Sequence, residues 1–134
     1  MIARVVHPFN LQKALEHVIA NKDSAGVDGV SIKELRKVFT EKKPQRIEAI
    51  IQGNYKAQPI LGIKIPKGNG NTRLLGVPTT TERVLQQAVA QSIAPLFEPE
   101  FKPNSFGFRP NKNARQAVGQ AREYIHQGLT TLWI

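Results

Sequence analysis

Two cations flank a glycine-rich turn near the middle of the chain. Lys67 precedes the run Gly68-Asn69-Gly70-Asn71, and Arg73 follows it. Lysine offers a compact point charge and arginine a planar fork of donors, and both suit phosphate oxygens. The two charges are expected about a triphosphate's span apart, so the pair indicates a phosphate-binding site. Taken alone, the same residues fit equally well two exposed cations on a hairpin.

The rest of the sequence offers little catalytic chemistry. Glu98 and Glu100 are close carboxylates, but they alternate with Pro99 and Phe101, and we interpret them as ordinary surface acids. The three histidines have no neighbours typical of a catalytic triad: His7, His17 and His126. With no cysteine, the chain has neither a disulfide framework nor a thiolate metal site. We therefore expect no catalytic residue and no metal ligand in this chain.

The charge balance points to a polyanionic partner. Nineteen Lys and Arg against ten Asp and Glu give a net charge of +9, which most often marks a nucleic-acid-binding protein. Two tracts, 53–81 and 101–122, contain cations and no acid, as expected of a surface that follows phosphates. Their cations are Lys56, Lys64, Lys67, Arg73, Lys102, Arg109, Lys112, Arg115 and Arg122. A solvated basic face without a specific partner is the alternative.

Length and hydropathy limit the class of protein. A chain of 134 residues with 40% apolar and 22% charged residues builds one domain, or one lobe of a larger protein, and is not a disordered tail. No apolar run approaches the ~18 residues of a spanning helix, and residues 1–8 lack the apolar stretch of a signal peptide. We expect a cytoplasmic protein with no membrane partner.

Apolar spacing predicts three helices in the first part of the chain. The stripe of the first is Leu11, Ala14, Leu15, Val18 and Ile19. Asn10 is expected to cap this helix, and a loop over 24–29 is expected to follow it. Ser31 and Glu34 form a capping-box pattern that starts the second helix. Pro44 is expected to open a third helix, which ends at Gly53 or Asn54.

The period then changes to that of an extended chain. Residues 60–66 and 72–77 flank the glycine-rich turn and predict an antiparallel hairpin. Leu61, Ile63 and Ile65 are expected on one face and Lys64 on the other. Thr79 and Glu82 repeat the capping-box pattern at the start of the next helix.

A loop rich in Pro and Asn over 95–113 separates this helix from the last one. The last stripe is Ala114, Ala117, Val118, Ala121 and Ile125, and Gly128 is its expected stop. Residues 129–134 predict a final strand.

Four motifs, in this order, resemble the fingers region of group II intron-encoded reverse transcriptases, the maturases. They are Ala25-Gly26-Val27-Asp28-Gly29; the hairpin Ile65-Pro66-Lys67 with Thr72-Arg73-Leu74-Leu75-Gly76-Val77-Pro78; Glu82-Arg83-Val84-Leu85-Gln86-Gln87-Ala88; and Asn104-Ser105-Phe106-Gly107-Phe108-Arg109-Pro110. The resemblance extends from about Leu11 to Ile134. Each motif alone is weak to moderate, and their shared order and spacing make the match strong.

The resemblance implies a fold and a set of roles. Members of the family that the chain resembles are RNA-directed DNA polymerases, a class of nucleotidyltransferase, with right-hand architecture and two Mg²⁺ ions. It implies that Lys67 and Arg73 bind the triphosphate of the incoming nucleotide. It implies that the loop with Gly26 and Asp28 covers the template strand. The remaining residues that we assign to template RNA are Lys64, Asn104, Ser105, Arg109 and Arg115.

Two departures from the family pattern concern the first strand of the hairpin. Many relatives carry a basic pair after Gln-Pro, where this chain has Gln58-Pro59-Ile60-Leu61-Gly62. Relatives often have an acid where this chain has Lys64. We interpret the change as a displacement of the basic charge along the strand.

A third departure is that the chain stops at Trp133-Ile134, before the family's first metal-binding aspartate. We therefore expect a truncated fingers lobe that is inactive alone, with no cofactor of its own and Mg²⁺ only in the full-length parent. An unpaired apolar edge at Leu132, Trp133 and Ile134 predicts a homodimer.

The sequence thus predicts a mostly helical α+β fold with about five helices and one long antiparallel hairpin. It predicts a single fingers domain over 1–134, with N-terminal helices and the template-covering loop in 1–52, the hairpin in 53–78, and helices and the start of a palm strand in 79–134. The expected function is binding of template RNA and a nucleotide triphosphate. A free-standing basic RNA-binding module stays open, as does a CRISPR-associated or diversity-generating reverse transcriptase.

Overall fold

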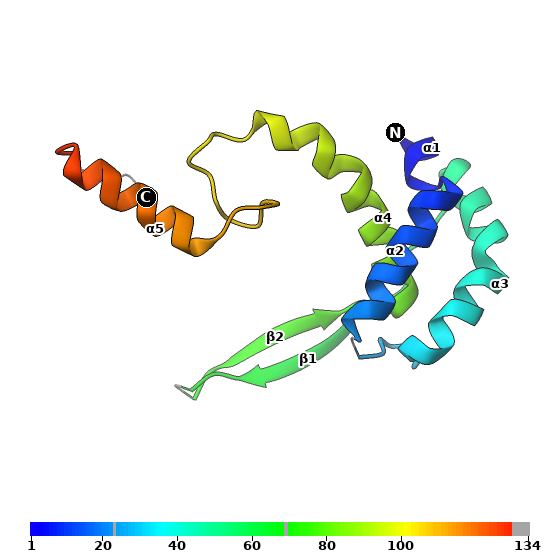
Figure 1. The fold of residues 1–134 in the computed structure, drawn as a ribbon. Helices are drawn as coiled ribbons and strands as arrows, with labels where there is room; N and C mark the ends of the chain where they lie inside the picture. Colours follow the sequence, from blue (N-terminus) through cyan, green and yellow to red (C-terminus); the bar gives the residue numbers. More distant parts are fainter. Residues whose placement is uncertain (23, 69, 130–134) are drawn as a thin grey trace. The chain divides into compact units, whose positions relative to one another are not determined.

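The computed structural model describes residues 1–22, 24–68 and 70–129. Their elements are α1 (Ile2–Val5), α2 (Pro8–Asn21), α3 (Ile32–Ile51), β1 (Leu61–Pro66), β2 (Thr72–Val77), α4 (Thr80–Phe97), the 3-10 turn η1 (Glu98–Glu100) and α5 (Ala114–His126) (Figure 1). The predicted α+β composition, mostly helical with one antiparallel hairpin, is confirmed. The chain divides into an N-terminal unit, Met1–Ile93, and a C-terminal unit, Ala94–Ile134. The single domain expected over 1–134 stays a prediction.

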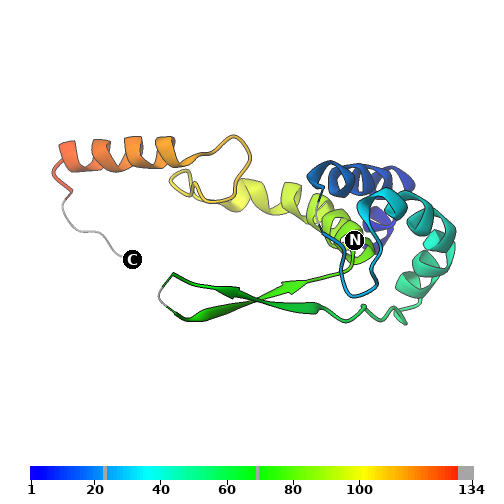
Figure 2. The ribbon, with the colours of Figure 1, turned by 90° about the horizontal axis from the view of Figure 1, so that it is seen from below.

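The core of the N-terminal unit is built from residues of α1, α2, α3 and α4. Figure 2 shows the ribbons of these helices. Its buried members are Val5, Leu11, Ala14, Leu15, Val18, Leu35, Phe39, Val84 and Ala88. The predicted stripe of α2 is confirmed, since all its members lie in or against this cluster. Removal of these apolar side chains from water supplies the main driving force for the fold.

The start of α2 differs from the prediction. His7, not Asn10, is the N-cap, and its Nδ1 accepts the Phe9 N–H at 3.3 Å. Pro8 stands at the first helical position, where its missing N–H costs no bond. Asn10 lies inside the helix, and its Nδ2 donates to the Val5 and Ala88 carbonyls, both at 2.9 Å. The Asn10 side chain therefore links α2 to α1 and α4 through hydrogen bonds.

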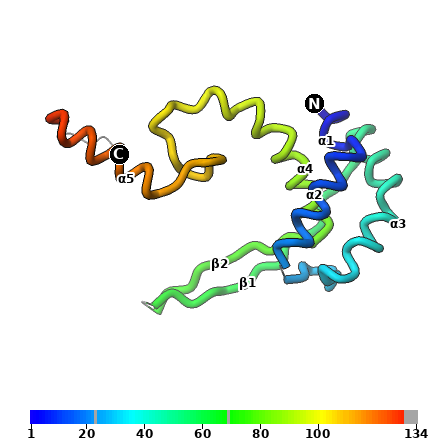
Figure 3. Tube along the Cα trace, viewed as in Figure 1, coloured from blue at the N-terminus to red at the C-terminus, as the bar shows by residue number. Residues whose placement is uncertain are grey.

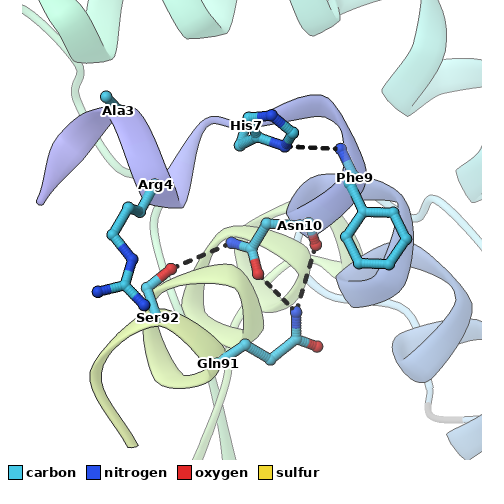
Figure 4. A pocket seen from close by; sticks show the side chains of 7 residues that line it. All are labelled: Ala3, Arg4, His7, Phe9, Asn10, Gln91 and Ser92. Atoms are coloured by element: carbon cyan, nitrogen blue, oxygen red, sulfur yellow. Dashed lines mark hydrogen bonds between the residues drawn. The ribbon is translucent and has the colours of Figure 1, made fainter. Parts of the chain in front are cut away.

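The same residue lines the floor of a cavity of about 420 Å³. Gln91 Nε2 donates to Asn10 Oδ1 at 2.9 Å, and Asn10 Nδ2 also donates to Ser92 Oγ at 3.2 Å. Figure 4 shows these amides close together below His7 and Phe9. Because the polar groups on the floor are already paired with one another, they hold the three helices in place.

Helix α3 is continuous where two helices were predicted. Pro44 lies inside it and not at the start of a third helix. Leu35 and Phe39 before the proline and Ile47 after it all pack on the same core cluster. This packing on both sides outweighs the bond that the proline removes, so tertiary contacts override local propensity. At the predicted start, Glu34 Oε2 accepts the Ser31 N–H at 3.1 Å, which confirms the capping box there.

The hairpin forms where it was predicted. Strands β1 and β2 pair antiparallel, with Leu61 opposite Val77 and Pro66 opposite Thr72. Lys67 N–H donates to the Asn71 carbonyl at 2.6 Å and closes the turn. Val77 is buried, whereas most other strand residues are exposed or half-buried, so the hairpin is anchored at its base.

The C-terminal unit contains the end of α4, η1, a long loop and α5. Asn113 Oδ1 accepts the Gln116 N–H at 3.0 Å and caps α5, and Gly128 with φ 82° follows its end as predicted. No residue of α5 is buried, and Val118 and Ile125 of its apolar stripe are 61% and 64% exposed. Residues 130–134 of the predicted final strand lie outside the described part, as do Leu132, Trp133 and Ile134 of the predicted dimer contact.

None of the helices in 1–22, 24–68 and 70–129 is both long and apolar enough to cross a bilayer. The same residues contain no group of three or more His, Cys, Asp or Glu side chains that could hold a metal ion.

Candidate nucleic-acid and nucleotide interface

Three predicted site residues lie along the hairpin, and all three are exposed. Lys64 stands opposite Leu74 and Arg73 stands opposite Ile65. Cross-strand partners share a face and neighbours along a strand alternate, so Lys64 and Arg73 lie on opposite faces. Lys64 shares its face with the pair Gly62 and Gly76, and the predicted apolar face of Leu61, Ile63 and Ile65 is confirmed on the other side. The hairpin thus presents one cation to each side.

Lys67 lies at the turn between these strands. Besides the bond from its N–H to Asn71, its carbonyl accepts the Gly70 N–H at 3.2 Å. Gly70 has φ 79°, a conformation that glycine adopts without strain. The turn therefore has a defined backbone around Lys67, close to the start of the strand that carries Arg73.

The predicted template-covering loop is packed against the base of the hairpin (Figure 3). Gly26 is buried there, and a Cβ on Gly26 would lie 2.6 Å from Thr79 Cα and 2.8 Å from the Pro78 carbonyl oxygen. Both contacts are with backbone atoms, which cannot rotate away as the end of a side chain can. Only glycine therefore fits at this position. Arg83 Nη2 ties the two segments further, since it donates to the Ser24 carbonyl at 2.7 Å and to the Pro78 carbonyl at 3.0 Å.

The tip of this loop faces solvent. Asp28 is exposed, and its Oδ1 accepts the Val30 N–H at 3.3 Å, a local bond that shapes the turn. Gly29 has φ 67° and donates its N–H to the Gly26 carbonyl at 3.1 Å. Val27 is 50% exposed. The loop therefore combines a buried anchor at Gly26 with an exposed tip over 27–29.

The structure reveals a pair that the sequence patterns did not indicate, the half-buried Tyr55 and the buried Glu82. Thr79 Oγ1 accepts the Glu82 N–H at 3.2 Å, as one half of a capping box requires. The Glu82 carboxylate points elsewhere, and its Oε1 accepts the Tyr55 hydroxyl at 2.6 Å and the Gln58 N–H at 3.1 Å. Glu82 is 6% exposed. It connects the start of α4 to the segment that leads into β1.

This pairing changes the acidity of the tyrosine. Burial is the largest cause that raises the pKa of Tyr55, and the Glu82 carboxylate beside it adds to the effect. Arg46 opposes the shift through its positive charge. Tyr55 therefore stays a neutral donor to Glu82 at physiological pH. The two residues are 27 positions apart, and neither periodicity nor a local motif brings such a pair together.

In the C-terminal unit, Arg109 holds the shape of the loop that carries the fourth motif. Its side chain is 11% exposed and forms an ion pair with Glu98 at 2.8 Å. The other donors reach the carbonyls of Lys102 at 2.8 Å, Ser105 at 3.0 Å and Glu98 at 3.4 Å. Nε also donates to Glu98 Oε1 at 3.0 Å, so all five N–H groups of the guanidinium are used.

The interpretation of Glu98 as an ordinary surface acid is therefore wrong, since its carboxylate neutralises Arg109. In this conformation Arg109 has no donor left for a phosphate. Asn104 in the same loop and Arg115 in the first turn of α5 are exposed, and Ser105 is half-buried. Phe108 is fully exposed and has φ 56°, an uncommon conformation for an aromatic residue.

Comparison with known proteins supplies the family. No known protein-family model matches the chain. Protein YkfC of Escherichia coli (strain K12) is 28% identical over 120 residues, which is 88% of this chain. The group II intron-encoded protein LtrA of Lactococcus lactis subsp. cremoris is 32% identical over 107 residues, or 78% of this chain. Over most of its length, this chain is homologous to group II intron-encoded proteins.

A further relative is also an intron protein. The protein described for COX1/OXI3 intron 2 of Saccharomyces cerevisiae is 27% identical over 99 residues, or 74% of this chain. The predicted resemblance to group II intron reverse transcriptases and maturases is thus confirmed for this region. The matched part is small in each relative: it spans 32% of YkfC, 18% of LtrA and 11% of the yeast protein.

Proposed function

We propose that this group II intron-type region is the fingers part of an RNA-directed DNA polymerase, which binds template RNA and the incoming nucleotide triphosphate. The observation that carries the proposal is the packing of Gly26 on Pro78 and Thr79. It joins an exposed loop tip to the base of a hairpin with three exposed cations, all within one compact unit. A loop that covers a strand and a hairpin that grips phosphates would then move together.

The two faces of the hairpin suggest a division of labour. Lys67 at the turn and Arg73 near the start of β2 are the proposed ligands of the triphosphate, because a point charge and a planar fork suit its oxygens. Lys64 lies on the opposite face, beside the bare backbone of Gly62 and Gly76. We assign Lys64 to the template RNA, together with the loop of Gly26 and Asp28.

In the C-terminal unit, the proposed RNA contacts belong to two exposed residues and one half-buried residue. Asn104, Ser105 and Arg115 are the candidates. Arg109 is a positioning residue, because all its donors are used within the loop, one of them on the Ser105 carbonyl. This assignment replaces the direct phosphate contact first expected of Arg109.

We assign the polymerisation chemistry itself to a part of the protein outside the described residues. The two Mg²⁺ ions that the family uses require carboxylate ligands, and residues 1–22, 24–68 and 70–129 contain no cluster of three or more His, Cys, Asp or Glu side chains that could hold a metal ion. We place the metal site in a longer, cytoplasmic parent, and we derive no step through it from this chain. The intron RNA is the proposed partner in the cell.

A binding module without an enzymatic parent is the second candidate. It is favoured by the net charge of +9 and by the two tracts without acids. This alternative requires RNA affinity but no dependence on a nucleotide.

Steady-state kinetics on the longer protein that contains this region distinguishes the two. Lys67→Ala and Arg73→Ala should each raise the KM for the nucleotide or lower kcat by about tenfold or more, because a charge-assisted phosphate bond contributes roughly 1.5–3 kcal/mol. Lys37→Ala is the matched control, since Lys37 is an exposed lysine of α3 away from the hairpin. Wild-type nucleotide dependence in both hairpin variants would overturn the triphosphate assignment.

A further inference from the structure

A polar pocket in the N-terminal unit lies outside the proposed interface. It has a volume of about 270 Å³ and is formed by the second half of α3, the segment before β1 and the start of α4. Three cationic side chains line it, Lys42 and Arg46 from α3 and Lys56 from the segment that follows. The proposed RNA and nucleotide contacts use none of them.

Arg46 provides the sharpest observation. Its Nη1 is inaccessible to solvent, and within the described part of the chain it has no hydrogen-bond partner. A buried donor without an acceptor is costly, more so on a charged group, and native structures rarely leave one unpaired. An acceptor oxygen of a bound molecule would satisfy this donor, once the neighbouring long side chains move enough to admit it.

The charge of the pocket specifies the kind of acceptor. Against the three cations stands one lining carboxylate, that of Glu82, whose Oε1 already accepts the Tyr55 hydroxyl and the Gln58 N–H. The carbonyls at the end of α3 are also paired, since Gly53 N–H donates to Ile50 and Asn54 N–H to Ala49. The pocket therefore keeps an excess of positive charge that its own acceptors do not neutralise.

We propose that this pocket binds a phosphate group, with Arg46 as its principal ligand and Lys42 and Lys56 as supporting charges. Arginine matches phosphate oxygens with paired donors, and the lysines add point charges that need no fixed geometry. The tetrahedral group is small enough to enter with part of its water shell. The phosphate comes either from an RNA backbone or from a free phosphate or nucleotide, and its chemistry is the same in both.

The first test is titration of the chain with inorganic phosphate, followed by amide chemical shifts at Tyr55, Lys56 and Gln58. Arg46→Gln should weaken binding by about tenfold or more, and Lys42→Gln by a smaller factor. Lys37→Gln removes the same charge from the same helix away from the pocket, and it should leave the affinity unchanged. Equal affinity in Arg46→Gln and Lys37→Gln would overturn the proposal, as would shifts confined to the hairpin turn.

A second arm identifies the source of the phosphate with a short oligouridine RNA at constant ionic strength. If the RNA backbone is the source, Arg46→Gln weakens the binding of RNA and of inorganic phosphate by similar factors, and inorganic phosphate competes with RNA for the pocket. If a free phosphate is the source, only the inorganic phosphate titration responds. Should Arg46→Gln unfold, Lys42→Gln serves as the test, because Lys42 is exposed and not part of the core. Neither arm depends on nucleotide kinetics at Lys67 and Arg73, so this proposal and the proposed function fail separately.

Discussion

Gly26 lies against Thr79 so closely that a Cβ atom on the glycine would stand 2.6 Å from the Thr79 Cα. The two residues belong to segments more than fifty positions apart, a loop between two helices and the junction of β2 with α4. Their contact fixes the exposed loop tip to the base of the hairpin.

Replacement of Gly26 by alanine should destabilise the N-terminal unit. The added methyl group meets backbone atoms of Pro78 and Thr79, and the loop must shift to accept it. We expect a loss of about 1–3 kcal/mol in the free energy of unfolding, measured by urea denaturation. Gly68→Ala is the control, because a Cβ there meets nothing within 4 Å. Equal stability of the two variants would show that the loop is not held at Gly26.

The Tyr55 hydroxyl should ionise well above the ordinary range of tyrosine. Its pKa is raised by burial first and by Glu82 second, so the fold favours the neutral form. The unfolded chain releases this proton near pH 10, whereas the folded chain retains it. The stabilising contribution is therefore complete below pH about 10 and is lost as the pH rises through the raised pKa.

Absorbance titration of tyrosinate checks this expectation. The chain has two tyrosines, and Tyr55→Phe should abolish the late-titrating one. The same variant leaves Glu82 Oε1 with the Gln58 N–H alone and should cost about 1–3 kcal/mol of stability at neutral pH. A variant that keeps the late titration would show that Tyr55 is not the buried group.

Arg109→Lys should loosen the loop of the C-terminal unit although it keeps the charge. A lysine has three donors and no planar fork, so it cannot replace five bonds to Glu98, Lys102 and Ser105. We expect hydrogen exchange at the Ser105 N–H, which donates to the Lys102 carbonyl at 3.0 Å, to accelerate by roughly tenfold or more. Unchanged exchange would mean that the guanidinium does not maintain the loop.

Arg115→Ala should instead weaken RNA binding without loosening that loop. If about four cations contact single-stranded RNA, log affinity should fall with log salt at a slope of roughly −3. Loss of one phosphate contact at the exposed Arg115 should reduce the magnitude of that slope by about 0.7. Fluorescence anisotropy at several salt concentrations measures it. A slope equal to that of the parent chain would remove Arg115 from the proposed contacts.

Much of the local structure follows from the sequence alone. The stripe of Leu11, Leu15 and Val18, the capping box of Ser31 and Glu34, and the strands around the turn after Lys67 were all predictable. Each depends on residues within a few positions of one another, where spacing and turn chemistry act directly. The four motifs likewise identified the family that the relatives confirm.

Only the tertiary structure decided the rest, because the deciding partners are distant in sequence. Packing of α3 on both sides of Pro44 kept one helix where a local rule predicted two. Glu82 turned from its expected cap toward Tyr55, and Asn10 toward Ala88 and Ser92. From its residue type, Arg109 was predicted to bind a phosphate. Its burial against Glu98 and two loop carbonyls, which no pattern reveals, made it a positioning residue.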